Sequence, residues 1–166
     1  MSRGFFRIIG SLMVLGIVGL WVLVRPTESR RITRTLEALA KEASFRPGEG
    51  QLRRLARVES FANAFTEDAV IHFETLGIPP AQLSGRDEIR SLAGAIQILQ
   101  GGMDVQLFDP VVTLGPAEDT ARVYLTASAS SGKQEAFTAQ EFEFRLVRRD
   151  GTWRIRELNT VKTLRR

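Results

Sequence analysis

A run of seventeen uncharged residues near the N-terminus constrains this chain more than any other feature. The run, IIGSLMVLGIVGLWVLV, starts at Ile8 and ends at Val24, between Arg7 and Arg25. It is just long enough for a helix to cross the hydrocarbon of a bilayer, and it lacks the polar face of a buried soluble helix. A cleavable signal peptide would close on small residues, whereas LVRPTESRR follows here. We therefore predict an uncleaved transmembrane anchor within residues 1–26, with the lipid bilayer as its partner, and one domain over residues 27–166.

The charges on either side of this run give two conflicting predictions of its orientation. Two arginines precede it, Arg3 and Arg7, and a larger set follows it: Arg25, Arg30, Arg31, Arg34 and Lys41. A count of positive charges keeps the domain in the cytoplasm. A short basic tip before a signal-like apolar run normally exports the domain that comes after it. We expect a single-pass protein of the cell inner membrane with its domain on the periplasmic, extracytoplasmic side, and the cytoplasmic side is the alternative.

The composition excludes several classes of function. The chain has 166 residues, 23 Lys and Arg against 19 Asp and Glu, one histidine and no cysteine. Much of the surplus of +4 lies beside the apolar run and at Arg165 and Arg166, so no nucleic acid partner is predicted. One histidine without cysteines provides no metal site, and no glycine loop carries the residues of a phosphate site. No metal and no cofactor are therefore predicted.

Hydrophobic spacing after the apolar run predicts three helices. Apolar residues recur at helical spacing over residues 27–44, and RPGEG ends that segment. Residues 51–65 carry a second apolar stripe, made of Leu52, Leu55, Val58, Ala62 and Phe65. The third helix lies in LSGRDEIRSLAGAIQILQGG, with an N-cap at Ser84 and two acidic residues, Asp87 and Glu88, in its first turn.

Extended segments separate and follow these helices. The first is DAVIHFE, and four longer ones follow the third helix: MDVQLFDPVVTL, TARVYLTASAS, EAFTAQEFEFRLVRR and TWRIRELNTVKTL. Short turns such as RDG join the long segments into an antiparallel meander. Three helices and one such sheet predict an α+β domain with its helices on one face of the sheet.

Three motifs resemble the nuclear transport factor 2-like superfamily, which includes the SnoaL-like polyketide cyclases and the ketosteroid isomerases. They are FTEDAV at residues 65–70, SGRDEIR at residues 84–90 and DGTWRIRELNTV from residue 150. The resemblance covers residues 32–164. It implies a cone in which a curved antiparallel sheet closes over about three helices and leaves a pocket between them. Because this cone carries enzymes, ligand binders and structural adaptors alike, it does not select a function.

The isomerase branch of the resemblance implies a general base five residues after the aspartate of D-A-x-x-x. Counting from Asp68 puts that position at Phe73, which cannot take a proton. Strand parity agrees, because Ala69, Ile71 and Phe73 should face the core or pocket while His72 points the other way. We therefore assign no catalytic residue and expect the only histidine to lie on the outer face of its strand.

Aromatic residues are the candidates for lining the pocket: Phe61, Phe65, Phe73, Tyr124 and Trp153. The leading hypothesis is a membrane-anchored binding or assembly module, with a protein partner or a second copy of the chain meeting the sheet. The alternative is a SnoaL-like enzyme or small-molecule binder that takes an apolar substrate in the pocket. A solidly packed interior would remove the enzyme, whereas an open pocket with an inward tyrosine or acid would favour it.

Overall fold

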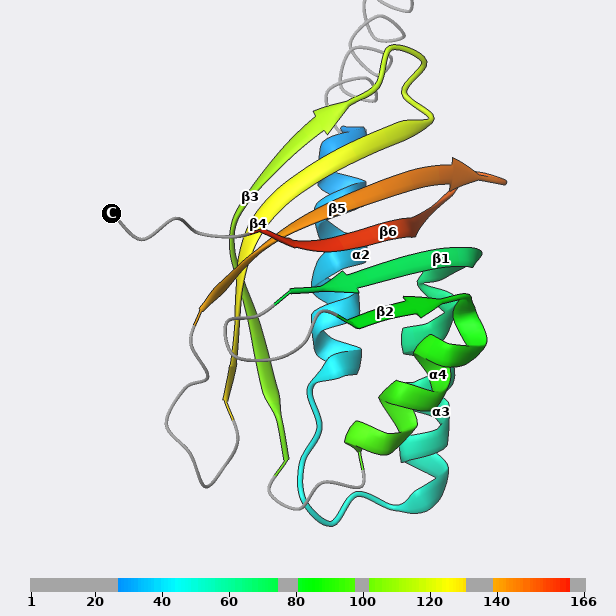
Figure 1. The fold of residues 1–166 in the computed structure, drawn as a ribbon, viewed down its shortest axis with the longest axis vertical. Helices are drawn as coiled ribbons and strands as arrows, with labels where there is room; N and C mark the ends of the chain where they lie inside the picture. Colours follow the sequence, from blue (N-terminus) through cyan, green and yellow to red (C-terminus); the bar gives the residue numbers. More distant parts are fainter. Residues whose placement is uncertain (1–26, 75–80, 98–101, 131–138, 162–166) are drawn as a thin grey trace, which may run out of the picture.

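Six strands between residues 65 and 161 form one curved sheet (Figure 1). The computed structural model describes residues 27–74, 81–97, 102–130 and 139–161. The strands lie in the order β2-β1-β6-β5-β4-β3. Their bounds are Phe65–Phe73 (β1), Ala81–Ser84 (β2), Asp104–Leu114 (β3), Thr120–Ser130 (β4), Gln140–Arg149 (β5) and Thr152–Val161 (β6).

The inner face of the sheet forms most of the core. Val123 of β4, Leu146 of β5 and Ile155 of β6 are each at most 1% exposed. Along β4, buried Ala121, Val123 and Leu125 alternate with exposed residues, as expected for a strand with one buried face. The predicted RDG turn joins β5 to β6, and its Asp150 and Gly151 both have positive φ angles, of 52° and 76°. Two successive positive φ angles are the backbone requirement of a tight hairpin turn whose twist matches the strands.

The pairing of the strands differs from the predicted antiparallel sheet in two ways. Strand β1 pairs in parallel with β6, with Ile71 opposite Leu158, so the sheet is mixed. A short strand, β2, which the sequence does not predict, pairs antiparallel with β1. Parallel pairing requires a long connection, and here the rest of the domain provides it. Spacing within one segment carries no information about such a distant partner.

Helix α2 (Glu28–Ala43) lies against the inner side of the sheet and buries Ile32, Leu36 and Leu39. Its first turn is tied to the β5–β6 hairpin. The indole Nε1 of Trp153 donates to Glu28 Oε2 at 2.8 Å, and a guanidinium nitrogen of Arg148 lies 3.2 Å from Glu28 Oε1. The hydrogen bond from Trp153, together with the positive charges of Arg31 and Arg148, lowers the pKa of Glu28 below its ordinary value.

The other end of α2 is fixed by its neighbours in space. Arg57 donates to the carbonyl oxygens of Lys41, at 2.9 Å, and of Ser44. The hydroxyl of Ser44 accepts a hydrogen bond from the backbone N–H of Val105 at 2.9 Å. Cationic donors satisfy carbonyls that a helix C-terminus leaves unpaired. These contacts hold the end of α2 beside the start of β3.

Helices α3 (Gln51–Asn63) and α4 (Arg86–Ile96) pack against each other at one end of the sheet (Figure 1). The predicted stripe of α3 is only partly correct, because Val58 and Ala62 are buried while Leu52 and Leu55 are 84% and 56% exposed. Residue 84 is also not the N-cap of α4. Gly85 is the N-cap, and Ser84 ends β2, where its N–H donates to the Glu88 carboxylate at 2.7 Å.

The predicted membrane anchor lies outside the described residues, since it falls in residues 1–26. Among the residues that the structure does describe, no helix combines the length and hydrophobicity needed to cross a bilayer.

Candidate functional site

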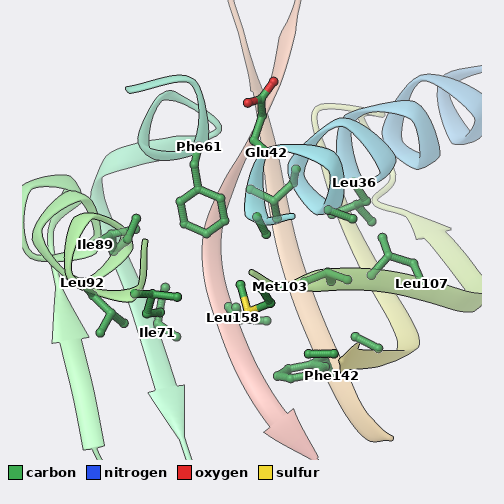
Figure 2. A pocket seen from close by; sticks show the side chains of 18 of the residues that line it. Leu36, Glu42, Phe61, Ile71, Ile89, Leu92, Met103, Leu107, Phe142 and Leu158 are labelled. Carbon is green, nitrogen blue, oxygen red and sulfur yellow. The ribbon is translucent and has the colours of Figure 1, made fainter. Parts of the chain in front are cut away.

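A cavity of about 350 Å³ lies between the helices and the inner face of the sheet. Its wall is almost entirely hydrocarbon (Figure 2). The apolar lining residues are Leu36, Leu39, Ala40, Ala43, Phe45, Phe61, Ile71, Phe73, Ile89, Leu92, Ala93, Ile96, Met103, Val105, Leu107, Ala127, Ala129, Phe142, Phe144 and Leu158. The volume lies within the range of small-molecule pockets. The interior of the cone is therefore not solidly packed.

The helical part of the wall follows from two apolar stripes. Leu36 and Leu39 of α2 and Ile89 and Leu92 of α4 are spaced three residues apart, so each pair lies on one face of its helix. Only Ile89 of the α4 stripe is buried, and Leu92 is partly exposed beside the cavity. The apolar stripe of α4 therefore borders the cavity along much of the helix.

The sheet supplies the opposite wall from five neighbouring strands, β1, β6, β5, β4 and β3. Ile71 of β1, Leu158 of β6, Phe142 of β5 and Leu107 of β3 point into the same space in Figure 2. Ile71 and Leu158 are register partners across the parallel pair. The parallel pairing that the sequence analysis did not predict therefore brings two lining residues together.

Four polar residues also belong to the lining, and none of them forms an acid–base pair. They are Glu42, Gln97, Ser128 and Gln140. The carboxylate of Glu42 sits at the end of α2 and points away from the apolar side chains in Figure 2. The side-chain amide nitrogen of Gln140 donates to the backbone oxygen of Val161 at 2.8 Å. General acid–base catalysis needs a titratable group within hydrogen-bond reach of the substrate. Apart from this outward Glu42, the described residues of the lining include none.

The five aromatic candidates are not brought together in one place. Phe61 and Phe73 line the cavity. Phe65 is fully buried beside Phe61, with their ring centroids 5.4 Å apart, and belongs to the core. Tyr124 is 40% exposed on the outer face of β4. Trp153 is 4% exposed and makes its hydrogen bond to Glu28 at the first turn of α2.

Strand β1 has the predicted parity. Ala69 and Ile71 are buried, Phe73 lies on the cavity wall, and His72 is exposed. The position that the resemblance implied for a general base thus presents a phenyl ring to the cavity. Within the described ranges, no group of three or more His, Cys, Asp or Glu residues is arranged to hold a metal ion.

Shifted pKa values lie away from the cavity. The carboxylate of Glu28 has its lowered pKa at the far end of α2, and hydrogen bonding to Glu143 raises the pKa of Arg145 on the outer face of the sheet. Strongly perturbed groups often mark catalytic sites. Here they belong to structural contacts instead, so the electrostatics give no support to a catalytic centre in the cavity.

Several lining residues were not singled out from the sequence, although a signal for some of them exists. Gln97 follows Ala93 by four residues, which places a polar side chain on the apolar stripe of α4. The parity of β4 likewise predicts an outward Tyr124, because Val123 and Leu125 form the apolar set. No local pattern marks Met103, which reaches the wall because its backbone pairs with Phe45.

Comparisons with known proteins agree with this architecture. The family model described as the SnoaL-like domain matches residues 52–159. A comparison with curated proteins gives no match.

Solved structures resemble the chain over most of its length. One is a candidate scytalone dehydratase from Novosphingobium aromaticivorans, with a TM-score of 0.65, 18% identity, and coverage of 82% of this chain and 85% of that one. Another, from the same organism, is a nuclear transport factor 2-like protein with a cystatin-like fold, with a TM-score of 0.63, 17% identity, and 87% and 86% coverage. A third is a candidate aromatic ring hydroxylase, also from that organism, with a TM-score of 0.60, 19% identity, and 81% and 88% coverage. At these identities the likeness shows a shared fold and nothing finer.

Proposed function

The chain belongs to the SnoaL-like domain family, and from that premise we propose that it is a membrane-tethered binding domain whose cavity takes an uncharged, apolar small molecule. The observation that carries the proposal is the cavity of about 350 Å³ with its almost wholly hydrocarbon wall. Transfer of apolar surface from water into such a space is the main driving force for binding. Only a ligand of matching apolar surface gains from it.

Binding without catalysis fits the polar groups of the cavity. The position of the expected base is Phe73, and the carboxylate of Glu42 points away from the apolar wall. An anionic ligand would enter without a counter-ion, because no Lys or Arg belongs to the described lining. The enzyme names of two structural neighbours, the candidate dehydratase and the candidate hydroxylase, keep a catalytic role as the alternative.

The tether rests on the apolar run of residues 8–24, which ends three residues before Thr27, the N-cap of α2. Two arginines that follow the run in the sequence, Arg30 and Arg34 in the first turns of α2, are exposed. Anionic lipid headgroups attract such cations. We place the domain on the periplasmic side of the inner membrane. A reporter that matures only in an exported compartment, fused after Arg166, should be active, and activity of a cytoplasmic reporter instead would reverse this orientation.

A cavity-filling substitution tests the binding function. Ala127 of β4 lines the cavity, and the next residue toward the N-terminus, Thr126, lies on the outer face of the same strand. Equilibrium dialysis with 2-methylnaphthalene should give saturable binding to the native chain. We expect Ala127→Phe to weaken it at least about tenfold, because the added ring occupies ligand space, and the matched Thr126→Phe to leave it unchanged. The anion 2-naphthoate should bind much more weakly.

Two outcomes would contradict the proposal. One is the absence of saturable binding by the native chain. The other is equal affinity in the native chain and in a folded Ala127→Phe variant, since the ligand would then lie elsewhere.

A second candidate role, self-association or protein binding through the sheet, is favoured by a small apolar patch. Phe108, Val111 and Tyr124 are 43%, 61% and 40% exposed. A bulge at Asp109, with a φ angle of 51°, inserts one extra residue, so Phe108 and Val111 face the same side although they are three positions apart. Sedimentation analysis of the domain should then show an association that Val111→Asp removes. A native domain that stays monomeric up to high concentration would restrict this role to a different protein partner.

A further inference from the structure

One side chain of the cavity wall lacks a polar partner. Gln97 forms the C-cap of α4, is 8% exposed and lines the cavity. Its Oε1 atom is buried, and no hydrogen-bond donor meets it among the residues that the structure describes. A buried amide oxygen that has left water without a new partner costs free energy. In the wall of a ligand cavity, such an oxygen can receive its missing hydrogen bond from a polar group of the ligand.

We propose that Gln97 is the polar anchor of the cavity and that the ligand is a neutral, apolar molecule carrying one hydroxyl group. This inference rests on the binding function proposed above and specifies the chemistry of its ligand. The terminal oxygen and nitrogen of an amide exchange places when the group turns over. A hydroxyl matches either orientation, because it can donate to the oxygen or accept from the nitrogen.

The rest of the wall argues against other polar groups on the ligand. A carboxylate or phosphate would find no cation on the described lining, and an ammonium group would find only Glu42, whose carboxylate points away. Gln140 is a less suitable anchor, because its amide nitrogen already donates to the backbone oxygens of Val161 and Glu141. Among the described lining residues, Gln97 alone has a buried side-chain polar atom without a hydrogen-bond partner, so one neutral polar group on the ligand matches the cavity.

The experiment compares two ligands that differ only in a hydroxyl and a methyl group. The full-length chain, held in amphipol with protein-free amphipol as the blank, is dialysed against 2-naphthol and against 2-methylnaphthalene. The measured quantity is the ratio of the two dissociation constants, methylnaphthalene over naphthol. In Gln97→Met, which keeps the side-chain length, we expect this ratio to fall about tenfold from its native value. In the matched control Gln106→Met, an exposed glutamine outside the cavity lining, the ratio should stay at the native value.

Thermal melting without ligand provides a second readout. Because Gln97→Met removes a buried polar group without a partner, its melting temperature should equal or exceed that of the native chain. An unchanged ratio in Gln97→Met, whether or not its melting temperature drops, would overturn the hydroxyl anchor while leaving the binding function intact. If Gln97→Met does not fold, Gln97→Leu gives the same comparison. Absence of saturable binding of either naphthalene to the native chain would instead refute the binding function itself.

Discussion

The contact between Glu28 and Trp153 makes a specific prediction about stability. The Glu28 carboxylate accepts from the Trp153 indole at 2.8 Å and lies near Arg148 at 3.2 Å. In Glu28→Ala the buried indole N–H loses its acceptor, which costs about 1–3 kcal/mol. The loss of the two partly exposed ion pairs of Glu28, with Arg31 and with Arg148, adds up to about 1 kcal/mol. We therefore expect Glu28→Ala to lower the free energy of unfolding by about 2–3 kcal/mol. Glu28→Gln keeps an acceptor for the indole and should lose about 1 kcal/mol.

The dependence on pH separates the charge of Glu28 from its hydrogen bond. The folded-state pKa of Glu28 is lowered from its ordinary value of 4.5, so the carboxylate stabilises the fold above that value. This contribution is lost as the pH falls through 4.5 and then through the folded-state pKa. The difference in unfolding free energy between the native domain and Glu28→Gln should therefore be full at pH 7 and shrink below pH 4.5.

Urea denaturation of the 27–166 fragment provides the assay. The chain has two tryptophans, and this fragment keeps only Trp153, so its fluorescence reports directly on the contact. Glu37→Gln, at an exposed position of the same helix, is the matched control and should behave like the native domain. The reasoning fails if Glu28→Gln and Glu28→Ala are equally destabilised at pH 7, or if the native advantage over Glu28→Gln persists unchanged at pH 3.

Three further outcomes can be checked. His72→Ala should change the unfolding free energy by less than about 0.5 kcal/mol because His72 is exposed, whereas Ile71→Ala should cost about 2–5 kcal/mol because Ile71 is buried. Equal melting temperatures of these two variants would contradict the assignment of the two faces of β1. Gly102→Ala should destabilise the fold, since its φ angle is 77° and a Cβ would lie 2.8 Å from the Phe45 oxygen, and an unchanged urea midpoint would contradict that geometry. The full-length chain should sediment with membranes through carbonate and high-salt washes and keep residues 1–26, whereas release by salt would indicate a peripheral attachment.

Local patterns predicted the parts of the fold that depend on local physics. The alternation in DAVIHF gives the inward set of β1, and the helical spacing gives α2 within a residue of its bounds. The same patterns failed where a distant partner decides. Leu52 and Leu55 fit an apolar stripe, yet both are exposed, whereas Val58 and Ala62 later in the same stripe are buried. Strand β2 has only four residues, too few for a pattern of its own, and its place in the sheet is defined by its pairing with β1.

The cavity was harder to predict than the fold because it depends on what the core leaves unfilled. Phe61 and Phe73 were named as lining residues and lie on the wall. Trp153 is a large aromatic residue and so was a candidate, but its buried ring lies at the first turn of α2, at the end away from the cavity. Residue type predicts burial and not the boundary between packed core and empty space. That boundary depends on how the helices and the sheet pack together, which no single segment encodes.

The parallel pairing of β1 with β6 affects how the chain can be made. Of the six strands of this sheet, β1 is synthesised first and its neighbour β6 is synthesised last. Until β6 emerges, β1 can pair only with the short β2, and β5 also exposes an unpaired edge. Such edges recruit other chains, and pairings distant in sequence form slowly. A ribosome-bound chain, or one truncated before residue 152, should therefore depend on chaperones, whereas release of the finished chain allows the sheet to close in one cooperative step.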